Sequence, residues 1–255
     1  MITRLGLKVI DFFQTIWEVF TLFLNTLRSI PTAWFYRRQI FKQLYVFSIS
    51  TLPIAAVIAV FVGLVAMIQA TYQSTPIVPR TYTINVIFKS TILELCPMVL
   101  ALVLAGKLGA SLAAEIGSMK ITEQVDALQT LSLDPVGFLI LPRVTAGLIM
   151  LPVITIFANL IALFSVYIVA CHMTQWVSPS EFVSGLKMNF RPFELYFGNF
   201  IKPATYGFWI ALIGSYFGLK THGGAAGVGR TSTNAVVVSA VLIVLFDYYL
   251  GALLL

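Results

Sequence analysis

Long apolar stretches separated by short polar segments make up most of this 255-residue chain. Five of them reach the roughly 20 residues that a helix needs to cross a bilayer. They lie at about 46–70, 90–114, 144–171, 199–219 and 235–255. Because backbone polar groups find no water inside a bilayer, such stretches are helical. The pattern predicts an all-α integral membrane protein with about five transmembrane helices.

The N-terminal end of the chain has an amphipathic pattern instead. Its apolar positions recur at helical spacing and are Leu5, Val9, Phe12, Phe13, Ile16, Phe20, Phe23, Leu24 and Leu27. The polar positions between them are Lys8, Asp11, Gln14, Glu18, Asn25 and Arg28. A helix of this kind lies on the membrane surface. We therefore expect residues 1–43 to form an amphipathic interfacial region and residues 44–255 to form the transmembrane domain.

Composition supports this class, since 59% of the residues are hydrophobic and 10% are charged, against about 25% charged residues in soluble chains. The net charge of +6 reflects Lys and Arg in cytoplasmic segments and not binding of nucleic acid. Most of these residues fall on the same side of the membrane as the N-terminus, which predicts a cytoplasmic N-terminus and a periplasmic C-terminus. Cys96 and Cys171 are isolated in apolar stretches and offer no disulfide or metal site.

Small residues form two ridges on the second predicted transmembrane helix, namely Gly106, Ala110 and Ala114, and Gly109, Ala113 and Gly117. Such ridges allow close helix packing, either within the chain or between two subunits. Beyond them Ser118 can cap a new helix. That helix, at about 117–131, is too polar to cross lipid, and its apolar positions Ile121, Val125, Leu128 and Leu131 lie at helical spacing. We expect a short cytoplasmic amphipathic helix ended by Asp134-Pro135, with a solvated loop helix as the alternative.

Three ionisable residues fall within or near the ends of predicted crossings: Glu94, Lys202 and Asp247. Each costs roughly 2.5 to 3.5 kcal/mol at the centre of a bilayer, which makes them functional candidates. They are expected either to pair at a similar depth or to line the polar part of a lipid cavity, beside the candidate lining residues Leu93 and Pro97. Alternatively, Lys202 reaches out to the outer surface, and Asp247 is a buried partner for a neighbouring helix.

At this point the sequence resembles the MlaE-type permease subunits of ABC lipid transporters. The resemblance rests on an ordered set of motifs, which are Glu94-Leu95-Cys96-Pro97, Ala105 to Ala110, Ala114-Glu115-Ile116-Gly117, Met119 to Gln124, Asp126-Ala127-Leu128, Asp134-Pro135, Pro142-Arg143, Gly227 to Val237 and Asp247-Tyr248. It covers most of the chain after about residue 90. Two departures stand out, since Leu93 occupies a position that is often Arg in relatives, and Leu195 one that can be Asp.

The resemblance implies a homodimer in a bacterial inner membrane, with two cytoplasmic ABC ATPase subunits beneath it and an MCE-domain, MlaD-like protein on its outer side. The complex would move phospholipid between the inner membrane and the envelope or outer membrane, whose lipid asymmetry such systems serve. Glu94 would belong to the substrate pathway. The 117–131 segment would be a coupling helix that docks on the ATPase through Gly117, Lys120, Glu123, Gln124, Asp126 and Leu128.

Two other classes of function compete with this interpretation. The chain lacks the GxxxxGK[ST] loop that holds ATP phosphates, so we expect it to carry no cofactor, with ATP and Mg²⁺ held by the partner ATPase and Gly223 to Gly229 forming a flexible cytoplasmic turn. An intramembrane lipid-modifying enzyme would need a converging nucleophile and base, whereas His172 and His222 are predicted on opposite sides. An autonomous channel or carrier would need more charged sites at the midplane than this sequence has.

Overall fold

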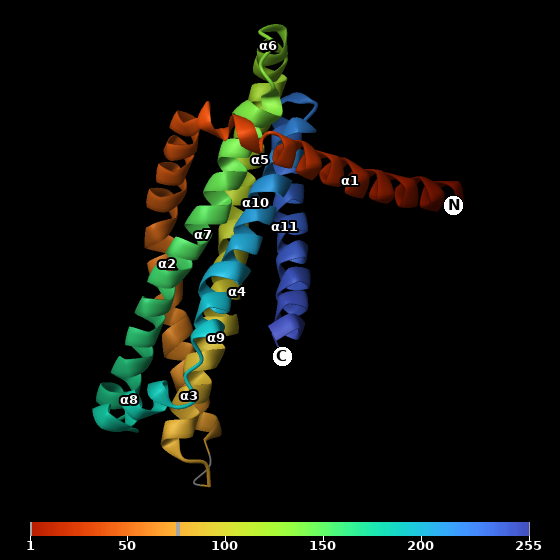
Figure 1. Cartoon of the computed structure of the whole chain (residues 1–255). Coiled ribbons are helices and arrows are strands. Elements are labelled where there is room, and N and C mark those ends of the chain that lie inside the picture. The colour runs from red at the N-terminus through yellow and green to blue at the C-terminus, as the bar shows by residue number, and fades with distance from the viewer. Residues whose placement is uncertain (1, 75–76, 255) are drawn as a thin grey trace. The chain divides into compact units, whose positions relative to one another are not determined.

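The computed structural model of the chain describes residues 2–74 and 77–254, and it leaves out the side chains of residues 2–9, 11, 12 and 254. The predicted amphipathic positions Leu5, Lys8, Val9, Asp11 and Phe12 therefore lie outside the described side chains. Every regular element of the described part is helical (Figure 1), which confirms the all-α prediction. The elements are α1 (Ile2–Arg28), η1 (Ile30–Trp34), α2 (Arg37–Gln73), α3 (Arg80–Ser90), η2 (Thr91–Leu95), α4 (Cys96–Leu104), η3 (Ala105–Gly109), α5 (Ala110–Ile121), α6 (Gln124–Thr130), η4 (Val136–Ile140), α7 (Leu141–Tyr167), η5 (Ile168–Met173), α8 (Pro179–Lys187), α9 (Pro192–Tyr196), η6 (Phe197–Ile201), α10 (Lys202–Leu219) and α11 (Gly224–Leu254).

Four continuous helices in the described residues are long and apolar enough to cross a membrane: Arg37–Gln73, Arg80–Ile121, Val136–Met173 and Gly224–Leu253. They contain four of the five predicted crossings. The fifth, at 199–219, is also helical in η6 and α10 but does not reach the same apolarity, because it contains Asn199 and Lys202. The helices extend beyond the predicted limits, since backbone hydrogen bonding continues past the apolar stretch that marks the lipid-embedded part.

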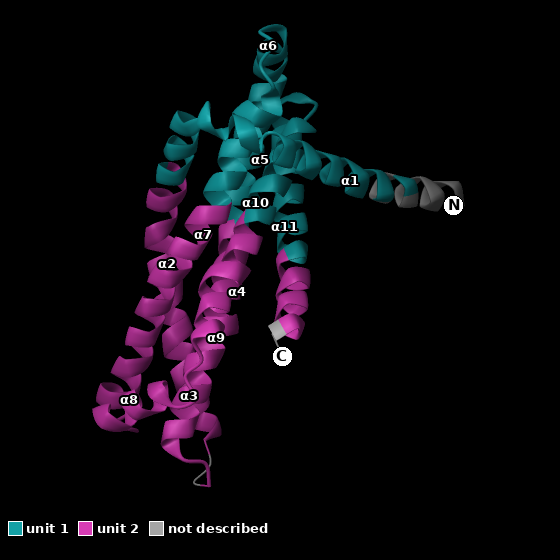
Figure 2. Cartoon of the chain, in the orientation of Figure 1, with its two compact units in different colours: residues 1–45, 105–147, 208–242 teal, residues 46–104, 148–207, 243–255 magenta. Residues whose placement is uncertain are grey.

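The chain divides into two compact units (Figure 2). Unit 1 holds residues 1–45, 105–147 and 208–242, and unit 2 holds residues 46–104, 148–207 and 243–255. In unit 1 the small-residue ridge of α5 packs against α10. A Cβ on Gly214 would lie 3.1 Å from the Gly109 carbonyl oxygen, and one on Gly218 would lie 2.7 Å from the Ile116 Cβ. This ridge therefore serves packing within the chain.

Unit 2 contains an apolar cluster near the ends of its long helices, formed by Met67, Ile84, Ile87, Val166, Val169, Ala170, Val177 and Phe182. The short helices α3 and α8 close over it. The amide of Asn85 on α3 donates to the carbonyls of Gly185 at 3.2 Å and Met188 at 2.6 Å. Ser178 and Glu181 form a capping box at the start of α8, which satisfies backbone N–H groups there.

Three π-helical segments each end two residues before a proline. Segment η2 precedes Pro97, η4 precedes Pro142 and η6 precedes Pro203. A proline has no N–H to donate to the carbonyl four residues earlier, and the helix accommodates it with a wider turn. At Pro97 the carbonyl that lacks its helical donor is that of Leu93, which bonds to Lys202 instead.

The prediction of a single helix at about 117–131 is wrong. Helix α5 runs on through Ser118, which is not an N-cap, to Ile121. Thr122 then donates from its backbone N–H and its hydroxyl to the Ser118 carbonyl, at 3.0 and 2.9 Å. Glu123 has a φ of 59°, the left-handed conformation that stops a helix. The seven-residue α6 follows, and Val125 is buried while Ile121 and Leu131 are exposed, so the expected apolar face is split.

Two further local expectations are corrected. Asp134 does not end the preceding helix, because α6 already stops at Thr130. Its carboxylate instead accepts from the N–H groups of Val136 and Gly137, both at 3.0 Å, and so begins the next helix. The predicted flexible turn at Gly223 to Gly229 is helical from Gly224 onward. Positive φ values of 84° and 70° at Gly223 and Gly224 confine the turn to its first residues.

Candidate functional site

A free backbone carbonyl in η2 positions the central lysine of the site. Pro97 provides no N–H for the carbonyl of Leu93, four residues earlier, and the Cys96 N–H bonds to Thr91 instead. The Lys202 ammonium occupies the vacant position and donates to the Leu93 oxygen at 3.1 Å. Leu93 therefore contributes its backbone to the site, while Pro97 is buried and acts through the hydrogen bond it does not make.

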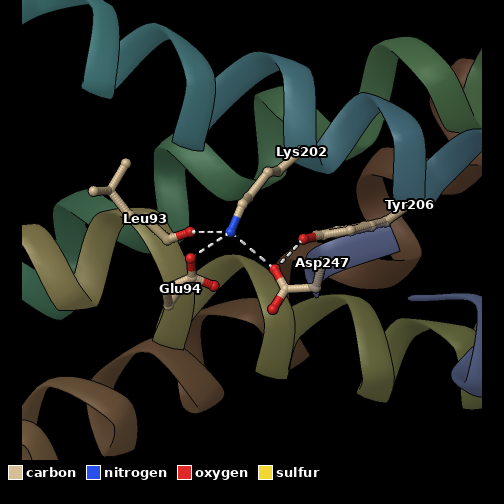
Figure 3. Close-up of polar contacts among 5 residues, drawn as sticks. All are labelled: Leu93, Glu94, Lys202, Tyr206 and Asp247. Atoms are coloured by element: carbon tan, nitrogen blue, oxygen red, sulfur yellow. Dashed lines mark hydrogen bonds and ion pairs between the residues drawn. The ribbon is translucent and has the colours of Figure 1, made fainter. Parts of the chain in front are cut away.

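The structure brings Glu94, Lys202 and Asp247 together, although they are far apart in the sequence (Figure 3). Lys202 Nζ lies 2.6 Å from Glu94 Oε1 and 3.0 Å from Asp247 Oδ1. The Lys202 side chain is 0% exposed, Asp247 is 13% exposed and Glu94 is 45% exposed. The expectation that these residues pair is therefore met, and the alternative that Lys202 reaches the outer surface is wrong.

Tyr206 completes this cluster and was missed from the sequence. Its hydroxyl donates to Asp247 Oδ1 at 2.5 Å (Figure 3). The signal was present in the spacing, because Tyr206 follows Lys202 by four residues on α10 and so lies on the same side of the helix. Gly251 lies over the cluster, where a Cβ would be 3.5 Å from Glu94 Oε1.

The charges of the cluster do not balance. Lys202 uses its three N–H donors on the Leu93 carbonyl, Glu94 and Asp247. Asp247 has a second donor in Tyr206. When both carboxylates are ionised, the single lysine leaves an excess negative charge, and Glu94 is the accessible carboxylate. At 45% exposed, Glu94 is therefore the carboxylate of the site that a ligand can reach.

Apolar grooves border the same segment of unit 2. A groove of about 380 Å³ lies between α2 and the η2–α4 segment and is lined by Phe61, Val62, Val65, Ala66, Gln69, Leu95 and Val99. A second groove, of about 450 Å³, is lined by Ile92 of η2, Asn159 of α7 and Asn199 of η6, and its other lining residues include several apolar side chains. The two asparagines are hydrogen-bonded at 2.9 Å. A charged cluster next to apolar grooves suits an amphiphile, whose two ends need different surroundings.

The expected coupling residues fall into separate environments in unit 1. Lys120 and Asp126 form an ion pair of 2.7 Å across the break between α5 and α6, and Glu123 and Gln124 are exposed there, whereas Leu128 is half-buried. Gly117 is packed inside α5, where a Cβ would lie 2.6 Å from Thr221 Oγ1. The exposed charged part is thus shorter than expected.

An ion pair that the sequence reasoning did not assign joins α5 to α7 in unit 1. Arg143 is buried, and its Nη2 lies 2.7 Å from Glu115 Oε1 while Nη1 donates to the Leu139 carbonyl at 2.6 Å. Within residues 2–74 and 77–254 no group of three or more His, Cys, Asp or Glu side chains is arranged to hold a metal ion.

Comparisons with known proteins show the family of the chain. Residues 40–253 match the family model for Permease MlaE. A probable ABC transporter permease protein of Rickettsia typhi is 34% identical over 252 residues, covering 98% of this chain and 95% of the relative. One from Synechocystis is 34% identical over 86% of this chain and 82% of its own length. The chloroplastic protein Trigalactosyldiacylglycerol 1 of Arabidopsis thaliana is 30% identical over 84% of this chain and 61% of its own length. The chain therefore belongs to the MlaE family of ABC transporter permeases.

Proposed function

We propose that this chain is the membrane subunit of an ABC transporter that moves phospholipid, or a related lipid, between a bacterial inner membrane and the outer layers of the envelope. Two copies form the permease, cytoplasmic ATPase subunits supply the energy with ATP and Mg²⁺, and an MCE-domain protein receives or delivers lipid on the outer side. The N-terminus is cytoplasmic and the C-terminus periplasmic. One relative is named for trigalactosyldiacylglycerol, which is itself a lipid, and this supports a lipid substrate.

The observation that carries the proposal is the charged cluster beside an apolar groove. Glu94 is the accessible carboxylate, and Leu95, the next residue, lines the groove of about 380 Å³. We assign Glu94 to the headgroup of the passing lipid, and the groove to its acyl chains. Lys202 and Asp247 are positioning residues, because every Lys202 donor is already used within the cluster. Leu93 and Pro97 act through the carbonyl that anchors Lys202.

The ATPase contact is assigned to the end of α5 and to α6. Glu123 and Gln124 are exposed at the break, and the Lys120–Asp126 pair joins the two helices across it. Leu128 gives α6 a partly apolar side. Gly117 transmits movement by its close approach to Thr221, two residues after the end of α10, since packed surfaces pass on displacement without a hydrogen bond.

The first test is a mild-detergent pulldown of the tagged chain from its native membrane, with mass spectrometry of proteins and lipids. We expect an ABC ATPase, an MCE-domain protein and phospholipid. A clean preparation without an ATPase would contradict the proposal and favour an autonomous carrier or an intramembrane enzyme.

The second test separates the pathway from its scaffold. In the reconstituted complex, Glu94→Gln is expected to lower lipid transfer about tenfold, the effect of one charge-assisted hydrogen bond. The matched control is Glu194→Gln, another lysine-paired carboxylate of unit 2, 2.9 Å from Lys89. Equal transfer in both variants would remove Glu94 from the pathway.

The third test addresses coupling. Glu123→Lys combined with Asp126→Lys is expected to leave membrane insertion intact while the ATPase no longer copurifies. Because Asp126→Lys also breaks the pair with Lys120, Glu123→Lys alone is the cleaner variant. Transport that continues with the ATPase bound in the double variant would show that this segment does not couple the two subunits.

A further inference from the structure

A charged pocket in unit 1 lies between α1 and the end of α10, and none of the roles assigned above uses it. It has a volume of about 450 Å³, within the range of about 300–1,000 Å³ that small-molecule sites occupy. Trp17, Glu18, Thr21 and Asn25 line it from α1, Tyr216 lines it from α10, and Lys220 lines it from the turn directly after α10. The α1 residues are spaced so that they share one side of the helix. A surface helix and the end of a bundle helix thus border an open hollow that their own side chains do not fill.

Two opposite charges meet in this pocket and both remain accessible. Lys220 Nζ lies 2.7 Å from each carboxylate oxygen of Glu18, and the Tyr216 hydroxyl donates to Glu18 Oε2 at 2.6 Å. The Lys220 side chain is 48% exposed and that of Glu18 is 27% exposed. Since an ammonium group has three N–H donors, Lys220 keeps one for a ligand. The hydrogen bonds from Lys220 and Tyr216 lower the pKa of the Glu18 carboxyl, which is therefore ionised at neutral pH.

The exposed apolar side of α1 next to the pocket indicates where the pocket would meet a membrane. Trp17 is 68% exposed, and its apolar neighbours Ile10, Phe13 and Phe20 are exposed as well. In a multi-pass membrane protein, an amphipathic helix with such a face rests at the level of the lipid headgroups. The nearby Gly117–Thr221 contact places Lys220 at the end of unit 1 that carries α6. The pocket therefore faces the leaflet on the α6 side.

We propose that this pocket binds the headgroup of a zwitterionic phospholipid from that leaflet, with the phosphate on Lys220 and the amine between Glu18 and the Trp17 ring. An indole face attracts an organic cation, and the free N–H of Lys220 suits a phosphate oxygen. A purely anionic headgroup would face the Glu18 carboxylate, and diacylglycerol would offer no phosphate oxygen to the remaining N–H of Lys220. The acyl chains continue along the exposed apolar face of α1. This site lies apart from the proposed transport pathway and fastens α1 to α10.

The test uses the full chain in membranes of defined composition. Benzoylphenylalanine placed at Thr21, which lines the pocket, crosslinks the lipid that occupies it, and mass spectrometry identifies the adduct. The control position is Leu24, on the exposed apolar face of α1 and outside the pocket lining. The probes are dioleoyl phosphatidylethanolamine, dioleoyl phosphatidylglycerol and dioleoylglycerol, which share acyl chains and differ in headgroup. Each is compared in the wild-type background and in the variant Glu18→Gln with Lys220→Gln, which removes both charges together.

At Thr21 we expect phosphatidylethanolamine to crosslink about tenfold more than dioleoylglycerol, the ratio given by losing one charge-assisted hydrogen bond, with phosphatidylglycerol between them. In the double variant that ranking should disappear at Thr21, while Leu24 should crosslink all three lipids equally in both backgrounds. Equal yields of the three lipids at Thr21 in the wild type would overturn the proposal, and so would an unchanged ranking in the double variant. Competition by inorganic phosphate without any headgroup preference would identify a phosphate site and overturn the lipid assignment.

Discussion

Replacing Lys202 with methionine tests whether the buried cluster of unit 2 stabilises the protein as its geometry implies. The substitution keeps the length of the side chain and removes the cation that two carboxylates share, Glu94 at 2.6 Å and Asp247 at 3.0 Å. Since one carboxylate oxygen lies 2.6 Å and the other 3.0 Å from Nζ, the two are no more than 5.6 Å apart. At an effective dielectric constant of about 20 this gives a repulsion of about 3 kcal/mol. This repulsion is similar to the cost of removing one partner of a buried ion pair, which is about 3–5 kcal/mol.

The assay is reversible unfolding of the purified protein by sodium dodecyl sulfate in mixed micelles. We expect Lys202→Met to lower the free energy of unfolding by about 3 kcal/mol, and adding Glu94→Gln to restore about half of the loss, because one of the two repelling charges is gone. The control is Lys220→Met, whose partner Glu18 is partly exposed and whose loss costs about 1 kcal/mol or less. The reasoning is refuted if Lys202→Met costs no more than Lys220→Met, or if Glu94→Gln deepens the loss.

Three further outcomes can be measured with the same preparation. Gly117→Ala is expected to lower the unfolding temperature, because its Cβ would lie 2.6 Å from Thr221 Oγ1. Gly106→Ala is the control and should raise the unfolding temperature through helix propensity, because a Cβ there meets nothing within 4 Å. Equal shifts in the two variants would contradict the packing at Gly117. Tyr206→Phe should cost about 1–3 kcal/mol in the same unfolding titration, since it leaves a buried carboxylate oxygen short of a donor, and no change would mean that this hydrogen bond is not formed. The pKa of Glu18 is lowered from 4.5, so the difference in stability between wild type and Glu18→Gln should be constant above the ordinary carboxyl pKa and vanish as the pH falls through the lowered one; a difference that grows in acid would reverse the assigned sign.

Hydropathy predicted the fold class because every segment that crosses lipid must be helical and mostly apolar. Four of the five predicted crossings were therefore found as long apolar helices, and a helix such as Arg80–Ile121 runs on past the predicted limits of its apolar stretch. The break at Glu123 was not predictable in the same way, because a glutamate in the left-handed conformation carries no sequence signal. The helical glycines after Gly224 misled the reasoning, since glycine permits turns without requiring them.

The residues of the candidate site were easier to predict from the sequence than the contacts between them. Glu94, Lys202 and Asp247 stood out in the sequence because each is a charge in or beside an apolar stretch. Their pairing was one of two open alternatives, because helix spacing fixes neighbours along one helix and not across three. Tyr206 was within reach through its spacing from Lys202. The carbonyl of Leu93 was readable as well, since the position of a proline tells which backbone oxygen loses its donor.

The hydrogen bond from Lys202 to the Leu93 carbonyl makes the residue at position 97 and the residue at position 202 depend on each other. With alanine in place of Pro97, a new N–H would compete for that carbonyl and leave the lysine with one acceptor fewer. With an apolar residue in place of Lys202, the carbonyl would lose this donor inside the protein. Each residue thus favours the presence of the other. We expect substitutions at positions 97 and 202 to occur together among relatives of this chain.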